Sequence, residues 1–192
     1  MTARTGMSTL IRRLRGLTHS GTADYSVDST TWWTDDQMQE VLDANRQDYY
    51  RVPLREVETY DGGTLVSYDY YTGYGNLEEM TGGSAVWDVE DGSGNSIGTA
   101  SYTPNYINGV IRFSADASGT SYYWSGRSYD LNAAAAQVWR EKAAWRAGFI
   151  SFSADDQSFS QAQWFAHCQQ MAGLYEASTG IRTAELYRSD LR

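Results

Sequence analysis

The chain has 192 residues, which suffice for one domain or for a small core that carries an insertion. Its 24 acidic and 15 basic residues give a formal net charge of −9, which argues against non-specific nucleic-acid binding, because neutralising phosphates requires a basic surface. One cysteine excludes an internal disulfide, and no apolar run is long enough to span a bilayer. The first residues lack the pattern of a signal peptide and leave open whether translation starts at Met1 or Met7.

The first predicted element is a short amphipathic helix over residues 8–17. Leucine and isoleucine recur on one face at helical spacing, whereas Arg12, Arg13 and Arg15 occupy the opposite face. A basic amphipathic helix can lie on a membrane or meet an acidic partner. Because this helix is short for membrane binding, we expect its arginines to face solvent or a protein.

A second helix is predicted over residues 34–50. Thr34 and Gln37 have the spacing of a capping box, in which each side chain bonds a free backbone N–H at the start of the helix. Pro53 is expected to end the helical region, since proline disfavours the helical conformation in the residue before it.

The pattern changes from helical to alternating over residues 54–126, and Tyr, Val, Ile, Thr and Trp dominate there, as strands prefer. This region contains ten acidic residues and two arginines, so most of the negative charge lies in it. Three β-hairpins are predicted: 54–60 with 64–71, 84–91 with 96–103, and 105–114 with 119–126.

A long, almost entirely apolar helix is predicted over residues 130–150. Seven of its residues are alanine, the best helix former, and Asp130 is placed to cap its N-terminus. A helix that is apolar over so much of its circumference packs on several sides. Four of its residues are therefore expected in the core or at a subunit interface: Leu131, Val138, Trp139 and Trp145.

A final helix is predicted from a capping box at Ser158 to about Ser178, followed by a mixed tail over residues 181–192. No pattern predicts catalysis, a metal or a cofactor. His167 and Cys168 are adjacent in this helix, and adjacent helical residues do not face each other, so they do not form a base and nucleophile. Two histidines and one cysteine give no zinc ligand set. The sequence thus favours a binding or structural protein over an enzyme.

Several segments, in their order along the chain, resemble the head–tail connector proteins of tailed phages, the adaptor or head-completion family. These are TLIRRLRGL near the N-terminus, the helix opening WWTDDQMQEVLDANRQDYYRVPL, the segment INGVIRFSADASGTSYYWSGRSYDL, and YDLNAAAAQVWREKAA with the following FSADDQSFSQAQ. The resemblance covers nearly the whole chain, and its motifs are structural rather than catalytic. The β region is longer than in the compact helical version of that family.

The resemblance implies a structural virion protein of the neck, assembled in the host cytoplasm, that forms a ring of twelve copies beneath the portal. The implied partners are other copies of the chain, the portal protein, and a tail or stopper protein; genomic DNA passes through without sequence-specific contact, and no membrane is involved. The tail is expected to grip the portal through Ile181, Arg182, Leu186, Tyr187, Arg188, Leu191 and Arg192. The alternative portal contact is the N-terminal helix, through Arg12, Arg13 and Arg15.

The expected fold class is α+β, with a four-helix core and a β-hairpin-rich insertion between the second and third helices. Residues 1–53 and 127–180 would supply the core, 54–126 the insertion and 181–192 the tail. A rival from another class is a β-rich carbohydrate-binding or adhesin-like module with helical support; an unrecognised hydrolase is a third. In the carbohydrate-binding module, a stacking platform would be formed by Tyr70, Tyr71, Tyr74, Trp87, Tyr122, Tyr123 and Trp124.

Overall fold

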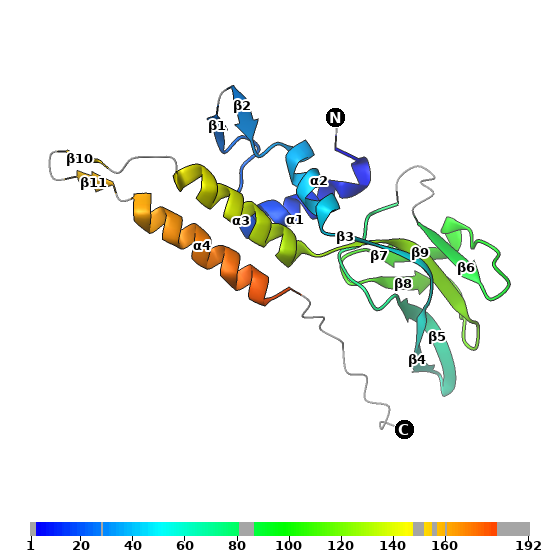
Figure 1. Cartoon of the computed structure of the whole chain (residues 1–192). Coiled ribbons are helices and arrows are strands. Elements are labelled where there is room, and N and C mark those ends of the chain that lie inside the picture. Colours follow the sequence, from blue (N-terminus) through cyan, green and yellow to red (C-terminus); the bar gives the residue numbers. More distant parts are fainter. Residues whose placement is uncertain are drawn as a thin grey trace. The chain divides into compact units, whose positions relative to one another are not determined.

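The computed structural model of the chain describes residues 3–27, 29–80, 87–147, 152–154, 157–159 and 161–179 (Figure 1). The chain divides into two compact units. The helical unit takes in the described residues of 1–47, 78–82 and 129–179, and the strand unit takes in those of 48–77 and 83–128.

The helical unit contains a 3-10 turn, four helices and two short hairpins. No helix in the described part of the chain combines the length and the apolar character needed to cross a membrane. The turn is Thr5–Met7, and the helices are α1 (Ser8–Thr18), α2 (Asp35–Ala44), α3 (Leu131–Ala147) and α4 (Gln161–Ala177). The hairpins are β1 (Tyr25–Val27) with β2 (Thr30–Trp32), and β10 (Phe152–Ala154) with β11 (Gln157–Phe159).

Side-chain caps fix where α2 and α3 begin. The Gln37 backbone N–H donates to Thr34 Oγ1 over 3.3 Å, and the Thr34 N–H donates to Gln37 Oε1 over 2.8 Å. The predicted capping box is therefore confirmed. The Asp130 carboxylate accepts from the backbone N–H groups of Asn132 and Ala133, over 3.0 and 2.9 Å, which confirms the predicted cap of α3.

Helices α1 and α2 and the first part of α3 share one core. It consists of buried apolar side chains, among them Leu14, Met38, Leu42 and Val138, all fully buried. Lys142 lies beside this core, and its ammonium donates to the Thr18 carbonyl over 2.9 Å and to Asp24 Oδ2 over 2.8 Å. The buried charge is thus paired and hydrogen-bonded, as burial requires.

Helix α4 packs outside that core. It lies along α3 through a second, smaller cluster made of Trp139, Ala143, Cys168 and Ala172. Among the described residues, Tyr175 is the α4 side chain that packs against the core of α1 to α3, and its hydroxyl donates to the Leu17 carbonyl over 2.9 Å.

The strand unit is built from two antiparallel sheets with the strand orders β4-β5-β8-β7 and β3-β9-β6. In the second sheet, an ion pair between Arg127 Nε and Asp48 Oδ1, 3.3 Å apart, joins β9 to β3. The strands are β3 (Arg46–Pro53), β4 (Arg55–Asp61), β5 (Thr64–Tyr71), β6 (Asp88–Asp91), β7 (Tyr102–Asn105), β8 (Val110–Phe113) and β9 (Tyr122–Tyr129), with a 3-10 turn at Thr99–Ser101.

The expected four-helix core with a β-hairpin insertion is wrong. Strand makes up about 33% of the described chain, so the chain has a β-rich body, and α4 lies outside the shared helical core. The second helix stops at Ala44 because the Asn45 amide turns back to the Val41 carbonyl, over 2.9 Å, and the next residues form β3. The last helix begins at Gln161 rather than Ser158, which lies in β11.

Of the three predicted hairpins, the first is confirmed, the second is present only next to its turn, and the third is wrong. β4 and β5 pair across Gly62-Gly63, whose φ values of 56° and 86° suit a two-residue turn. β6 pairs with β9 along its length and meets the predicted 96–103 segment only at a bridge between Glu90 and Ser96, while β7 pairs with β8. Alternation in sequence identifies strands and their faces, but it does not specify which strand lies alongside.

Gly109 allows the turn between β7 and β8 to approach the segment that follows β5. Its φ is 68°, and a Cβ atom there would overlap the Tyr74 carbonyl oxygen and Thr72 Oγ1. The Thr72 N–H donates to the Gly109 carbonyl over 2.9 Å. Only glycine suits this close approach.

The two large tryptophans of α3 are expected to differ in their effect on stability. Trp139 is 2% exposed and donates its indole N–H to the Leu17 carbonyl over 3.3 Å, so Trp139→Ala should lower the free energy of unfolding by about 3–5 kcal/mol. Trp145 is half-buried and stacks on Tyr25, with ring centroids 3.9 Å apart, so Trp145→Ala should cost about 1–2 kcal/mol. Denaturant unfolding of both variants tests this order, and equal losses would contradict it.

Candidate functional site

The candidate site is the side of α4 that faces away from α3, which we call the outer face of α4. Cys168 and Ala172 are buried against α3, and Met171 and Tyr175 are half-buried. Every other residue from Ala162 to Ala177 is exposed. A helix with so narrow a covered stripe would be expected to carry polar side chains around the rest of its circumference.

The exposed part of α4 carries large apolar side chains beside the neutral polar Gln163, Gln169 and Gln170, and it is nearly free of charge. Trp164, Phe165 and Leu174 are 42%, 38% and 57% exposed. The helix has no Lys or Arg and a single acid, Glu176, which forms an ion pair with Arg140 of α3. In a chain whose net charge is −9, such a surface is exceptional, and exposed apolar surface of this kind is typical of protein contacts.

Ring contacts hold Trp164 at the α3 side of this surface. The His167 ring lies between two indoles, with its centroid 5.6 Å from that of Trp164 and 5.7 Å from that of Trp139. The position of Trp164 is therefore fixed by the packing of α4 on α3, while over two fifths of its area remains exposed.

The four residues of α3 predicted for the core or a subunit interface lie at different depths. Leu131 and Val138 belong to the core of α1 to α3, and Trp139 belongs to the cluster between α3 and α4. Trp145 stacks on Tyr25 and is half-buried.

The three arginines of α1 lie in different environments. Arg15 is turned inward: it donates to Asp35 Oδ1 over 2.7 Å and to the Trp33 carbonyl over 2.8 Å, and its side chain is 13% exposed. Arg13 is half-buried and Arg12 is exposed. The tail residues expected to contact the portal, from Ile181 to Arg192, lie outside the described residues.

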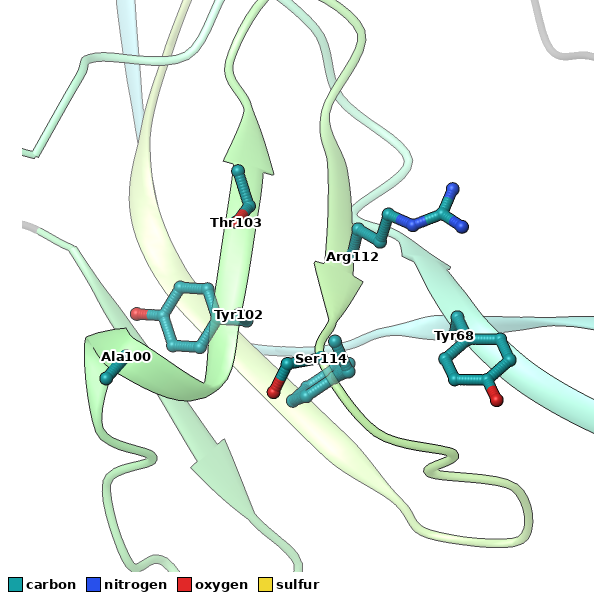
Figure 2. Close-up of a pocket in the computed structure, with 7 residues that line it drawn as sticks. Tyr68, Ala100, Tyr102, Thr103, Arg112 and Ser114 are labelled. Carbon is teal, nitrogen blue, oxygen red and sulfur yellow. The ribbon is translucent and has the colours of Figure 1, made fainter.

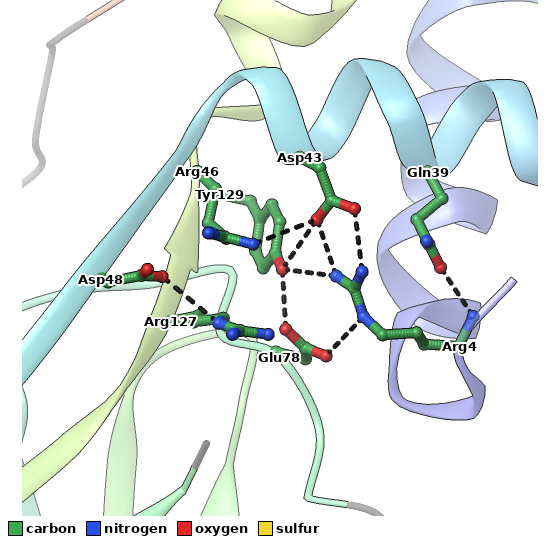
Figure 3. Close-up of polar contacts among 8 residues, drawn as sticks. All are labelled: Arg4, Gln39, Asp43, Arg46, Asp48, Glu78, Arg127 and Tyr129. Carbon is green, nitrogen blue, oxygen red and sulfur yellow. Dashed lines mark hydrogen bonds and ion pairs between the residues drawn. The ribbon is translucent and has the colours of Figure 1, made fainter. Parts of the chain in front are cut away.

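Arg4, whose role no sequence pattern predicted, joins the N-terminal residues to the rest of the helical unit (Figure 3). Its guanidinium forms two parallel bonds to Asp43, of 2.8 and 2.7 Å, and a third to Glu78 Oε1 of 3.0 Å. The Tyr129 hydroxyl donates to the other Glu78 oxygen over 2.7 Å. The Arg4 backbone N–H donates to Gln39 Oε1 over 2.6 Å.

Hydrogen bonds and burial both shift the pKa values of Arg4 and Tyr129 in this network. The Asp43 hydrogen bond, with help from Glu78, raises the pKa of Arg4 above its ordinary value against the opposing effect of burial. Burial, together with the Glu78 bond, raises the pKa of Tyr129. Glu78 has a side chain only 8% exposed, so its charge depends on Arg4 and Tyr129 for compensation.

Three of the seven aromatic residues of the carbohydrate-binding rival are buried, and the other four, Tyr71, Tyr74, Tyr122 and Tyr123, are half-buried. Tyr70, Trp87 and Trp124 are 1%, 6% and 0% exposed, and so lie in the core of the strand unit. The Tyr70 hydroxyl donates to the Ala117 carbonyl over 2.7 Å, and the Trp87 indole N–H donates to the Tyr102 hydroxyl over 3.2 Å. Buried rings cannot stack on a sugar, so these three residues are not part of an open binding platform.

Within the described part of the chain, no three or more His, Cys, Asp or Glu side chains are grouped as metal ligands. Comparisons with known protein families, with curated proteins and with solved structures find no match to this chain. The outer face of α4 is therefore the surface that best indicates a function, namely contact with another protein.

Loss of the Arg4 side chain is expected to destabilise the helical unit. Arg4→Ala leaves Glu78 buried with one partner fewer and should lower the free energy of unfolding by about 2–3 kcal/mol, a value at the lower end for a broken buried pair because Arg4 is about a third exposed. A chain that starts at Met7 should lose at least as much. Arg12→Ala, at an exposed position of α1, is the control and should unfold like the parent. Parent-like unfolding of Arg4→Ala would show that the network contributes nothing.

Proposed function

We propose that this chain is a structural virion protein, a head–tail connector of a tailed phage. In this proposal twelve copies form a ring beneath the portal, extend the DNA channel and join the capsid to a tail or stopper protein. The resemblance of the ordered sequence segments to the adaptor family supports the proposal. The observation that carries it is the almost uncharged outer face of α4, on which Trp164, Phe165 and Leu174 are exposed.

The outer face of α4 fits a subunit that is completed by its neighbours. α3 is covered by α1 and α2 on one side and by α4 on the other, and α4 leaves three large apolar side chains, Trp164, Phe165 and Leu174, exposed for another molecule. Copies that each carry a net charge of −9 repel one another over most of their surface. They can approach more closely through the nearly uncharged outer face of α4. A contact between two different surfaces of the same chain repeats, and it closes into a ring when the rotation allows.

The charge of the strand unit supports a DNA conduit. Its described residues include nine acids and four arginines, a net of −5. A wall of negative charge repels the phosphates of a duplex and so lets DNA pass without being held. The proposal assigns the chain no catalytic role and no cofactor.

The purified chain should assemble, and a charge on α4 should prevent it. Native mass spectrometry or sedimentation should find closed rings, free or after mixing with portal protein. Leu174→Glu places a carboxylate on the outer face of α4 and should shift the mass toward the monomer, because an unpaired charge in an apolar contact is costly. Ile107→Glu is the matched control, since Ile107 is a large exposed apolar residue of the strand unit, 46% exposed against 57% for Leu174. A parent that stays monomeric and ignores the portal would refute the connector proposal.

The tail is the proposed portal attachment. Deleting residues 181–192 should leave the melting temperature of the subunit close to that of the parent, because a terminal segment of this length builds no core. The same deletion should strongly reduce co-sedimentation with portal rings, since it removes four apolar anchors and three arginines. Undiminished co-sedimentation would move the attachment to α1, where Arg12→Glu would then be the variant to compare.

A further inference from the structure

The hairpin of β4 and β5 carries an arm that extends past the rest of its sheet (Figure 1). β8 pairs with β5 only from Asp69 to Tyr71, so the outer part of the hairpin is held by its own two strands. All residues from 58 to 65, which we call the arm, are exposed. Two strands without a covering layer gain little stability from burial, so an arm of this kind suggests a contact made elsewhere.

The tip of the arm carries an apolar pair flanked by acids. Tyr60 and Leu65 lie directly opposite each other in the β4–β5 register, which places their side chains on the same face. They are 78% and 40% exposed. Glu58 and Asp61 are close in sequence to Tyr60 and give the tip a negative charge.

A depression on the same unit has the complementary chemistry (Figure 2). It has a volume of about 360 Å³. The half-buried Tyr68 provides an aromatic wall, and Tyr102 and Phe113 line the depression with only 5% and 6% of their surface exposed. Packing fixes these walls: Tyr102 accepts the Trp87 indole N–H, and Phe113 stacks on Tyr122 with ring centroids 4.4 Å apart. A pre-formed site of this size suits one or two inserted side chains. The remaining lining residues are Ala100, Thr103, Arg112 and Ser114.

Arg112 supplies a positive charge at the rim of the depression. Its side chain is 68% exposed, and its guanidinium Nη1 lies 3.4 Å from Asp69 Oδ2. An exposed pair at this distance stabilises little, and a guanidinium has five N–H donors. Arg112 can therefore bond a second carboxylate brought in by another molecule.

The arm cannot fill the depression of its own copy. Tyr68 lines the depression, and Leu65 comes three residues before Tyr68 in the same extended strand. At about 3.4 Å per residue, Leu65 lies roughly 10 Å further along the strand, and the tip points away from Tyr68. The side chains that enter the depression must come from another copy.

We propose that the arm tip of one copy seats in the depression of the neighbouring copy. Tyr60 and Leu65 pack against the aromatic walls, and Asp61 meets Arg112. The inference rests on the proposed ring and gives the strand unit a place in it, as a second layer of contacts between neighbours. Because tip and depression are different surfaces of one chain, the contact is head-to-tail and repeats around the ring.

Tyr60→Ala tests the contact, with Tyr50→Ala as its matched control. Tyr50 is also a strand tyrosine of this unit and is 79% exposed, against 78% for Tyr60. Tyr60→Ala should weaken self-association of the full chain by roughly tenfold or more, measured by sedimentation equilibrium, because a tyrosine anchor in a pocket carries much of a contact's free energy. Tyr50→Ala should associate like the parent, and both variants should keep the parent melting temperature, since neither side chain is buried.

A charge exchange identifies the receptor. Asp61→Arg and Arg112→Asp should each weaken assembly, and the two changes combined should restore it, because the pair is rebuilt with reversed signs. Arg55→Asp, at an exposed arginine of β4 outside the depression, is the charge control.

The outcomes separate this inference from the connector proposal. If Tyr60→Ala associates like Tyr50→Ala while Leu174→Glu still prevents assembly, the arm contact is wrong and the connector proposal stands. If Tyr60→Ala weakens assembly but the charge exchange does not restore it, the depression is not the receptor and the inference is overturned. If the parent forms no assembly with itself or with the portal, both proposals fail.

Discussion

The helical unit depends on a single guanidinium. Arg4 meets Asp43 on α2, Glu78 from the segment that follows the first β stretch, and through Glu78 the Tyr129 hydroxyl at the entrance to α3. One guanidinium near the N-terminus therefore joins three stretches that are distant in sequence. Because Glu78 is nearly buried, its carboxylate is tolerable only while these donors are in place. Arg4 precedes the alternative start at Met7, so a chain that began at Met7 would lack these bonds.

The sequence predicted local structure well where the signal is a side chain acting on its own backbone. The capping box at Thr34, the Asp130 cap and the Gly62-Gly63 turn are all present, because each depends on residues within a few positions of one another. The end of α2 was predicted too late, because the Asn45 side chain bonds the last turn and the residues after it form a strand. Pro53, which was expected to end the helix, lies at the end of β3. Pairing of β6 with β9 joins residues more than thirty positions apart, and no local pattern encodes that choice.

The candidate surfaces were predictable only in part. The apolar stripe of the last helix is visible in the sequence, but the sequence does not reveal that α3, with a contact from α1 at Tyr175, covers only a narrow part of it. The same limit applies to aromatic residues: alternation places Tyr70, Trp87 and Trp124 on strands without telling a core from a platform, and burial decides for the core. Arg15 resembled a surface charge by its helical position and is instead held by Asp35 and a backbone carbonyl. Three-dimensional packing, rather than periodicity, assigns these roles.

The burial of Lys142 has a consequence for the chemistry of the whole surface. It is the only lysine of the chain, and its ammonium is occupied by a carbonyl and a carboxylate below the surface. All other side-chain cations apart from the two histidines are guanidinium groups, which do not lose their proton in any ordinary buffer and do not undergo lysine acetylation. The positive charges that the protein presents to its neighbours are therefore permanent. Amine-directed cross-linkers will find hardly any side chain to react with, so neighbours in an assembly have to be mapped through carboxylates or introduced cysteines.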